Sequence, residues 1–586
     1  MRRILLIRWS SSLLVLLFVV VSANAQDPAD HTYQALGAPA QRKTDIAWNR
    51  FHDHAGLHAI LQELHEAFPD LTELYSIGKS YEGRDLWCLE VTNKKKGDPS
   101  RKSGMYIDGN IHGNEVQAGQ VVAYAGWYLC ENYGHVPKVT QVVDDHVFYL
   151  IPTINPDGRD YWFHAAHTQN SSRSGKMPYD SDRDGLVDED DYDDLDGDGS
   201  ITRMRIKDPN GRWKPDPEYP EYLMVRAKAD EKGEYTILGQ EGIDNDGDGR
   251  INEDPAGGYD SNRNWAWDWQ PRHIQRGAHE YPFSLPNTRA VAEFVIAHPN
   301  IAGSQSFHNA GGMILRGPGR EGGDIQPADD RVLAYIAERG AKMLPHYRSL
   351  ISWKDLYPTL GDEMEWFYGA RGILGLVNEL WTPDNLYRQE LPRDEAGQRK
   401  TIEFIRYLLM NDGLVAWHEV EHPTYGKIEV GGTKKEWGRV PPSFLLEEEC
   451  HRNALFTVYH GEMMPLVKFG EVTGEKLGRR LYKVWVEVLN EGLMPTRCAQ
   501  DVAKHISPPD IMSISGERAK VISSGRVVDR FFKKVEPTKI RHHRVEFDTV
   551  PGMGTVRAQF IVSGTGSITI SFDSAKGGVL SKELEL

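Results

Sequence analysis

The stretch Tyr106-Ile-Asp-Gly-Asn-Ile-His-Gly-Asn-Glu115 predicts a buried strand over residues 105–107 that runs into a turn rich in Gly and Asn. A helix is expected to begin at Val116 and to run to about residue 132. Because His112 and Glu115 stand at this strand-to-helix corner, both side chains can face one cation. The pair alone is a weak signal. A histidine in a turn, followed by an acidic residue that the helix dipole favours, would give the same sequence pattern without binding a metal.

Length and charge bound the classes of function. The chain has 586 residues, so two or three domains are expected. Its formal net charge is −17, and the first 25 residues contribute three arginines and no acid. This balance argues against nucleic acid or an anionic membrane as a partner, and it favours bound cations.

The first 25 residues have the pattern of a signal peptide. Three arginines precede an apolar run over residues 13–21, and Ala23-Asn-Ala25 is a small-residue cleavage site. Residues 26–44 read as a polar leader. No later apolar run is long enough to span a bilayer. We therefore expect a secreted or periplasmic protein that is free of the membrane after removal of the signal; its oligomeric state is open.

From residue 45 onwards, helical and strand-like patterns alternate, which predicts an α/β fold with a mixed twisted sheet and helices on both faces. The run over 147–154 is continuously apolar, as in a strand buried on both faces. The other expected strands cover 71–77, 86–91, 301–307 and 373–378, and the expected helices cover 51–68, 288–297, 332–343 and 394–410.

The pattern changes near His418. Short alternating runs such as 481–489, 556–562 and 567–572 replace the helical periodicity, and turns with Gly and Pro separate them. This is typical of a β-sandwich. We place the β-sandwich at residues 418–586 and treat the helix over 394–410 as the last one.

The four cysteines do not form a disulfide scaffold. Cys88 lies in a strand-like run and Cys130 in a helix-like run, so both can be buried thiols. Bridges 88–130 and 450–498 are also compatible with an oxidising compartment.

Four further stretches supply chemistry downstream of the opening one. They are Ile151-Pro-Thr-Ile-Asn-Pro-Asp-Gly158, Asp260-Ser-Asn-Arg-Asn-Trp265, Gly303-Ser-Gln-Ser-Phe-His-Asn309 and Leu376-Val-Asn-Glu-Leu380. Loops beyond the carboxyl ends of sheet strands are where α/β proteins build sites. His308 at a strand end can complete a His, Glu, His ligand set that leaves one position for water. Glu379, at another strand end, can act as general base.

In these motifs the chain resembles the zinc metallocarboxypeptidase family related to pancreatic carboxypeptidase A, in a bacterial secreted form. The ordered match spans about 105–380, and the catalytic domain is expected over 45–417. The resemblance implies Zn²⁺ held by His112, Glu115 and His308, with Glu379 as general base. It also implies that Asn262 and Arg263 grip the terminal carboxylate of a substrate, while Asp260 orients His112.

Three further assignments follow from the resemblance. Tyr357 lies 22 residues before Glu379, which is the family's spacing for the tyrosine that closes over the substrate. Met364 falls near the floor of the specificity pocket and implies an apolar C-terminal side chain. The family's oxyanion-stabilising arginine follows the Asn-Pro-Asp-Gly segment. Arg173 is our choice, with a plain surface role as the alternative; Arg159 is too close to the strand end, and Arg203 and Arg205 qualify if the insertion folds back.

An acidic insertion over residues 176–258 separates the core motifs. Alternating carboxylates around a Gly turn make an oxygen cage suited to Ca²⁺, although a solvated acidic loop is the alternative. The loops resemble the start of EF-hand or thrombospondin type 3 loops and lack a bidentate Glu at position 12. The candidate Ca²⁺ ligands are Asp180, Asp182, Asp184, Asp188, Asp190, Asp194, Asp196, Asp198, Asp244, Asp246, Asp248 and Asn252.

The expected function is hydrolysis of C-terminal residues from peptides or protein C-termini by zinc-activated water. One alternative is a same-fold amidase that acts on peptidoglycan peptides. The other is a catalytically silent, calcium-stabilised binding protein whose β domain does the binding.

Overall fold

The computed structural model describes residues 36–532 and 534–586. The chain divides into two units, Met1–Ala40 and Gln41–Leu586. The predicted signal peptide (1–25) and the first part of the polar leader (26–35) lie outside the described residues. The described leader residues, 36–44, form turns and bends. Within the described ranges, no helix is long and apolar enough to cross a bilayer.

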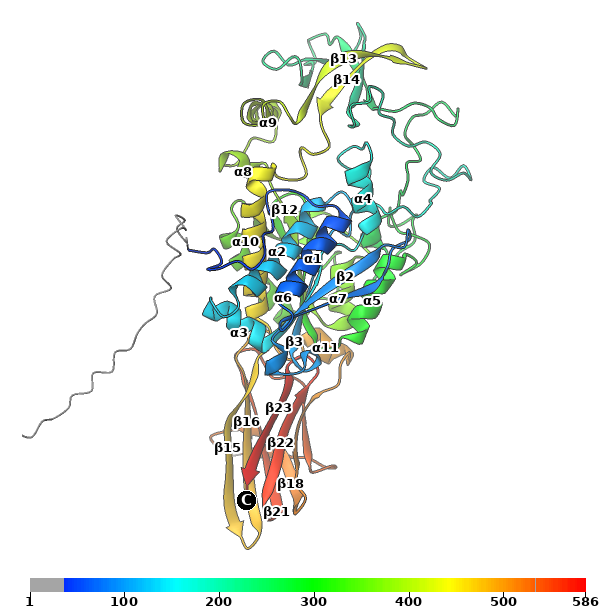
Figure 1. Cartoon of the computed structure of the whole chain (residues 1–586). Helices are drawn as coiled ribbons and strands as arrows, with labels where there is room; N and C mark the ends of the chain where they lie inside the picture. The colour runs from blue at the N-terminus through cyan, green and yellow to red at the C-terminus, as the bar shows by residue number, and fades with distance from the viewer. Residues whose placement is uncertain (1–35, 533) are drawn as a thin grey trace, which may run out of the picture. The chain divides into compact units, whose positions relative to one another are not determined.

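An eight-stranded mixed sheet forms the centre of the larger unit (Figure 1). Its middle strands β4, β3, β9 and β12 run parallel, and antiparallel pairs flank them. Every residue of β3, β4 and β9 is buried, as expected for parallel strands covered on both faces. The order is β1 (Thr72–Lys79), β2 (Asp85–Val91), β4 (His146–Ile151), β3 (Ser103–Gly109), β9 (Ile301–Asn309), β12 (Leu374–Leu380), β10 (Met313–Arg316) and β11 (Arg348–Ile351).

Helices cover both faces of this sheet, which confirms the predicted α/β class. The period of two along β3 sends Met105 and Ile107 into one core and Tyr106 into the other. The first core is closed by α1 (His54–Ala67), α2 (Val116–Asn132), α3 (Pro137–Asp145), α6 (Pro327–Met343) and α10 (Ser443–Glu462), and the second by α5 (Pro286–Ala297) and α7 (Glu363–Arg371).

A second, six-stranded sheet is built mainly from the acidic insertion. Its order is β13-β14-β5-β8-β6-β7. β14 pairs with β5, so a segment that follows the predicted catalytic domain completes the sheet of the insertion. The strands are β5 (Arg203–Lys207), β6 (Trp213–Pro215), β7 (Met224–Arg226), β8 (Tyr235–Gln240), β13 (Leu414–His422) and β14 (Gly426–Thr433); α4 (Pro156–His164), α8 (Asp384–Tyr387) and α9 (Glu395–Leu408) complete the helices of this half.

The structure differs from the expectation that residue 418 begins the β-sandwich and that no helix follows residue 410. Residues 414–433 belong to the insertion sheet, and α10 packs against α2. The buried face of α10 includes Glu449, Asn453, Thr457 and His460. These polar side chains interrupt the apolar spacing from which a helix is recognised, and Glu449 and Asn453 pair with buried side chains of other segments.

The C-terminal all-β part begins at Val467. Apolar side chains from a five-stranded and a four-stranded sheet share one core, as in a sandwich. The sheets contain β15 (Val467–Gly478), β16 (Leu481–Asn490), β21 (Thr555–Gly564), β18 (Ala519–Asp529) and β19 (Lys534–Pro537), and β20 (Arg544–Phe547), β17 (Asp510–Ser515), β22 (Ser567–Ser574) and β23 (Gly578–Glu585); the short helix α11 (Ala499–Lys504) precedes β17.

All four cysteines are buried free thiols. The pairing 88–130 is therefore not formed, because Cys88 lies in the core on one face of the central sheet and Cys130 in the core on the other. Cys450 and Cys498 are likewise separate thiols. The alternative of buried thiols describes the structure.

Candidate metal centre and substrate pocket

The structure brings His112, Glu115 and His308 together at the carboxyl ends of β3 and β9. His112 Nδ1 lies 3.0 Å from Glu115 Oε1, and His308 Nδ1 lies 3.0 Å from Glu115 Oε2. The two Nδ1 atoms are 3.2 Å apart. All three residues are buried. Three donor groups crowded around one point fit a bound cation, and this N₂O set is one that Zn²⁺ takes.

The turn that carries His112 is shaped by its neighbours. Asn110 adopts a left-handed conformation with φ of 57°, and its Nδ2 donates to the carbonyl of His112 at 2.6 Å. A Cβ on Gly113 would lie 2.3 Å from backbone atoms of Gly158 and Ser172, so only glycine fits there. The Gly113 N–H donates to the carbonyl of Arg173 at 3.0 Å. The turn is thereby tied to the loop that carries Arg173.

Asp260 holds the far side of the His112 ring. Its Oδ1 lies 2.9 Å from His112 Nε2, which leaves Nδ1 facing Glu115 and His308. Burial alone raises the pKa of Asp260, but Arg173 and His112 outweigh it and keep the pKa well below its usual range. A charged Asp260 can accept a hydrogen bond from Nε2–H of His112. The proton then stays on Nε2, and Nδ1 keeps the lone pair that a metal requires.

Glu379 stands beside the metal centre without being one of its three close groups. It pairs with His308 in the register of the parallel strands β12 and β9. Burial, followed by the negative charge of Glu115, raises its pKa. A carboxylate with a raised pKa is a better proton acceptor, which suits a general base.

One cavity brings together the residues predicted for catalysis and substrate binding. Arg263 is buried, and its Nη1 donates to the carbonyl of Asn262 at 2.6 Å. Asn262 Oδ1 accepts from the N–H of Glu363 at the start of α7. The cavity is lined by His112, Arg173, Asn262, Arg263, His308, Leu315, Ser352, Leu356, Tyr357, Thr359, Asp362, Met364, Val377 and Glu379.

Tyr357 and Met364 occupy contrasting places on this cavity. Tyr357 follows the π-helical turn Ser352–Leu356 and is 47% exposed, so its ring is free of tight packing. Met364 packs with Met313, Leu315 and Val377 in a small apolar cluster. The cavity thus has an apolar floor and an exposed aromatic at its rim.

Arg173 reaches the centre of the site, whereas the neighbouring arginines do not. Its Nη2 donates to Asp260 Oδ2 at 3.0 Å, and its Nη1 donates to Glu115 Oε1 at 3.1 Å. Arg159 is fully buried and donates to backbone carbonyls of residues 52 and 116. Arg205 pairs with Glu429 in the insertion sheet, and Arg203 is exposed there.

Sequence reasoning missed Arg439. Its Nη1 donates to the carbonyl of Asn309 at 2.6 Å and lies 3.6 Å from Glu115 Oε1. It stands 60 residues after Glu379 in a loop without a recognisable motif. No sequence signal connects this loop to the metal centre.

The acidic loops form clusters that the linear spacing did not predict. Asp180, Asp182 and Asp184 approach one another within one loop. Two further groups join both loops, and they include two glutamates that sequence reasoning missed: Asp182, Asp248 and Glu253, and Asp184, Glu189 and Asp246.

Other predicted Ca²⁺ ligands accept hydrogen bonds that hold the loops in shape. Asp190 is fully buried and accepts from the N–H of Asn252 and from Asn245 Nδ2. Asp188 accepts from the N–H groups of residues 179 and 257. Asp194 and Asp198 accept from backbone N–H groups of their own turn, and Asp196 contacts His418.

Comparisons with known proteins agree on one family. The family described as zinc carboxypeptidase matches residues 57–208 and 233–399. A domain of unknown function matches residues 466–585. Carboxypeptidase D of Mus musculus is 31% identical over 149 residues, which cover 23% of this chain and 11% of that protein. An inactive metallocarboxypeptidase of Saccharomyces cerevisiae is 34% identical over 122 residues, which cover 20% of this chain and 28% of that protein.

Solved structures that match this chain include thrombin-activatable fibrinolysis inhibitor, at 17% identity and a TM-score of 0.42 over 71% of this chain and 78% of that one. Carboxypeptidase A from Helicoverpa armigera has 14% identity and a TM-score of 0.43 over 71% and 74% of the two chains. This chain spans 11% to 28% of the length of the two curated relatives named above. The family match itself covers more than half of the 586 residues, and we conclude that the chain belongs to the zinc carboxypeptidase family.

Proposed function

We propose that this protein is an exported, zinc-dependent carboxypeptidase that removes C-terminal residues from peptides. The observation that supports it most is the single cavity shared by the metal-binding histidines, Glu379 and the Asn262–Arg263 pair. A catalytic group and a carboxylate receptor within one pocket are what cleavage next to a free C-terminus requires.

Recognition of the substrate falls to Asn262 and Arg263. A guanidinium can bind a terminal carboxylate through two parallel hydrogen bonds, and burial strengthens them. The apolar cluster around Met364 then favours an apolar C-terminal side chain. Tyr357, exposed at the rim, is placed to close over the bound residue.

Glu379 is the proposed general base. A zinc ion held by His112, Glu115 and His308 would supply Lewis-acid activation at the scissile carbonyl. Glu379 takes the proton of the attacking water and passes it to the departing amine. Arg173 stabilises the negative charge that develops on the carbonyl oxygen, because its guanidinium already stands beside Glu115.

Purified protein tests this proposal with matched peptides that differ only in a free or an amidated C-terminus. We expect release of the C-terminal residue from the free peptide alone, lost with a zinc chelator and restored by Zn²⁺. Absence of chelator-sensitive release would contradict the proposal. Release from both peptides would contradict the role of Arg263 as receptor of the terminal carboxylate.

Ca²⁺ as a structural ion belongs to the same proposal. The carboxylates of the two acidic loops approach one another across the loops, so like charges repel unless a cation lies between them. Desolvation and the neighbouring Asp254 raise the pKa of Glu189, and desolvation and Asp190 raise that of Glu253. Oxygen-only ligand groups of this kind suit Ca²⁺.

A further inference from the structure

Arg439 approaches the metal centre from a segment outside the region that matches the zinc carboxypeptidase family. The segment is residues 434–442, here called the strap, which leads from β14 to α10. Its course is fixed by burial. Lys435 Nζ donates to the carbonyls of Trp162 and Ala165 at 2.7 Å each. Val440 packs with Val116 and Trp162. The strap therefore presents Arg439 from a rigid position.

The guanidinium of Arg439 is held from two sides. Its Nε donates to Asn170 Oδ1 at 2.7 Å, and its Nη1 donates to the carbonyl of Asn309 at 2.6 Å. Asn309 directly follows His308, and Asn170 belongs to the loop that carries Arg173. The side chain is still 29% exposed. A fixed, partly exposed cation is a preorganised hydrogen-bond donor.

The position of Arg439 separates it from recognition of the C-terminal residue. Its Nη1 is 3.6 Å from Glu115 Oε1, within reach of the reacting centre. It does not line the cavity that holds Arg263 and Met364. A peptide whose last residue fills that cavity must leave the centre on another side. Arg439 is a cation at the centre but outside the cavity.

We propose that Arg439 contacts the peptide on the N-terminal side of the bond to be cleaved, as a donor to a backbone carbonyl. This rests on the proposed function, because it takes the cavity with Arg263 as the receptor of the C-terminal residue. The active site then includes the strap, beyond the domain predicted over residues 45–417.

Binding to zinc-free protein tests this contact without turnover. The variants are Arg439→Gln, Arg439→Lys and, as a control, Arg388→Gln, whose arginine makes an exposed ion pair with Glu448. One probe is a tetrapeptide with a blocked N-terminus, a free C-terminal carboxylate and an apolar last residue. The other probe is that last residue as a free amino acid. Arg439→Gln should weaken tetrapeptide binding about tenfold, leave amino acid binding unchanged and lower kcat/KM on the tetrapeptide; Arg439→Lys should recover part of the loss.

Equal tetrapeptide binding by wild type and Arg439→Gln would overturn the proposal, and so would an equal loss for both probes. If Arg439→Gln does not fold, Arg439→Lys replaces it in the comparison. This variant keeps the charge and should still bind the tetrapeptide more weakly than wild type does. A wild type that binds both probes but releases no residue would contradict the proposed function alone.

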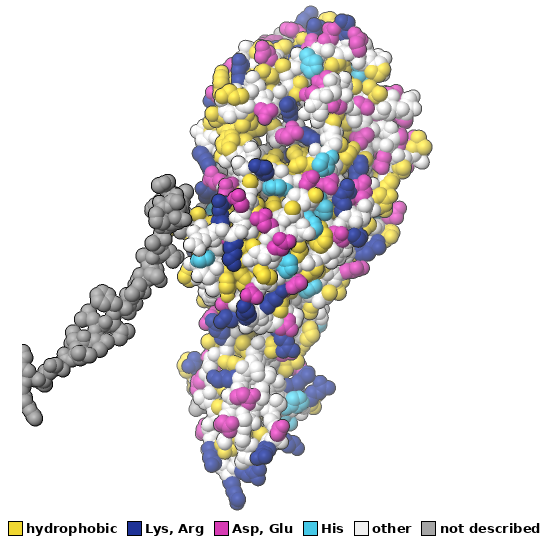
Figure 2. All heavy atoms as spheres, viewed as in Figure 1, with side chains coloured by type: hydrophobic (Ala, Val, Ile, Leu, Met, Phe, Trp, Pro, Cys, Tyr) yellow, Lys and Arg dark blue, Asp and Glu magenta, His cyan; other side chains and the backbone are white. Residues whose placement is uncertain are grey.

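A second, independent observation concerns the C-terminal sheets. Residues 467–586 hold 19 Lys and Arg against 14 Asp and Glu, a net charge of +5 in a chain of −17. Figure 2 shows Lys and Arg side chains gathered over this part of the surface. The whole-chain charge therefore conceals a region of opposite sign.

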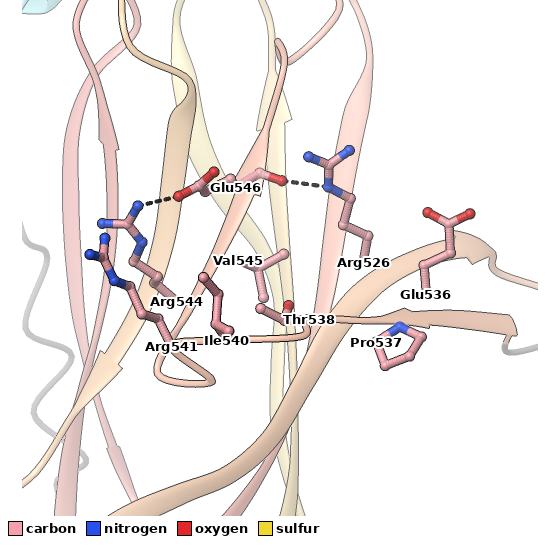
Figure 3. A pocket seen from close by; sticks show the side chains of 9 residues that line it. All are labelled: Arg526, Glu536, Pro537, Thr538, Ile540, Arg541, Arg544, Val545 and Glu546. Atoms are coloured by element: carbon pink, nitrogen blue, oxygen red, sulfur yellow. Dashed lines mark hydrogen bonds and ion pairs between the residues drawn. The ribbon is translucent and has the colours of Figure 1, made fainter.

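The same region exposes two adjacent aromatics. Phe531 and Phe532, at the turn between β18 and β19, are 89% and 87% exposed. Asp529 Oδ1 accepts from both of their backbone N–H groups at 2.9 Å, which holds the backbone of these two residues. A cavity beside the same hairpin is lined by Arg526, Arg541 and Arg544 and by Glu536 and Glu546, and Figure 3 shows the guanidinium groups of Arg541 and Arg544 side by side. Arg544 pairs with Glu546, and the adjacent Arg541 guanidinium favours an anion such as a phosphate.

We infer that this hairpin docks on a bilayer surface that contains anionic lipid. The two phenylalanines enter the interface, and the arginines meet the phosphate groups. Co-sedimentation of the full chain with vesicles tests this inference. Vesicles that contain phosphatidylglycerol are compared with vesicles of pure phosphatidylcholine. We expect binding to the anionic vesicles that weakens in high salt and falls at least tenfold for Phe531→Ser/Phe532→Ser and for Arg541→Gln. Met553→Ser, at an exposed turn between β20 and β21, is the control. Binding equal for both kinds of vesicle, or binding only to a soluble anionic polysaccharide, would overturn the inference.

Discussion

Asp260 and His112 are linked by a 2.9 Å contact between Oδ1 and Nε2, and the opposite ring nitrogen of His112 faces Glu115 and His308. One carboxylate, 148 residues away in sequence, thus leaves Nδ1 of His112 as the nitrogen that faces the proposed metal site. The same carboxylate receives Arg173 through Oδ2. Metal site and proposed oxyanion arginine are therefore oriented by one group.

Replacement of Asp260 by Asn should weaken zinc binding about 10–100-fold, the usual cost of removing a partner behind a metal histidine. The carboxamide can still pair with Nε2, but it lacks the charge that holds Arg173. Zinc affinity from chelator competition measures the effect. Asp268→Asn, at a partly exposed pair with Arg320, is the control and should match wild type. Unchanged zinc affinity in Asp260→Asn would show that the contact does not tune the metal.

Glu379→Gln should abolish measurable turnover while zinc remains bound. The amide cannot accept a proton from water, whereas the three metal-binding groups stay in place. Zinc content by atomic spectroscopy and peptide hydrolysis, measured on one sample, provide the check. Loss of zinc together with activity would instead place Glu379 among the ligands.

Arg263→Gln should raise KM for peptides with a free C-terminus about 10–100-fold, because a hydrogen bond to a charged group contributes roughly 1.5–3 kcal/mol. Its buried guanidinium has no other predicted task in catalysis. Initial rates on free and amidated peptides measure the preference for a free carboxylate, which should shrink in the variant. A preference equal to that of wild type would assign carboxylate recognition to another residue.

The sequence predicted most of the central sheet and the convergence of His112, Glu115 and His308 because both depend on local patterns. Continuous apolar runs read as buried strands, and His112, His308 and Glu379 stand where those strands end. The strap and α10 escaped because their roles are non-local. Arg439 acquires meaning only through contacts with Asn309 and Asn170, and Glu449 is tolerated in a buried helix face only because distant partners satisfy it.

Ca²⁺ should raise the thermal midpoint of the protein, and chelation should lower it. At a concentration 100 times its dissociation constant, one bound ion contributes about 2.7 kcal/mol. Asp182→Asn with Asp184→Asn removes one carboxylate from each of the two clusters described above that join the loops, so most of the Ca²⁺ response should disappear. Asp230→Asn, exposed in the same insertion, should respond like wild type. If Ca²⁺ does not change the thermal midpoint of the wild type, the loops are solvated acidic turns that bind no structural ion.

Glu449→Gln should stabilise the protein at pH 8 and change little at pH 5. Burial raises the pKa of Glu449 to about 7, although Asn385 Nδ2 and Tyr347 Oη donate to its carboxylate. The folded state therefore binds this proton more tightly than the unfolded chain does. Stability falls as pH rises through the window from about 4.5 to about 7, because the unfolded chain is already ionised there.

The amide of Glu449→Gln imitates the protonated acid, so its advantage should grow across this window to at most about 3 kcal/mol. Thermal midpoints at pH 5 and pH 8 measure it. The neighbour Glu448 provides a control of opposite sign: its hydrogen bond with Arg388 lowers its pKa, so Glu448→Gln should lose stability at pH 8 and regain it only as pH falls below the usual range for Glu. Equal losses for Glu449→Gln at both pH values would mean that the buried carboxylate is stabilised as an anion.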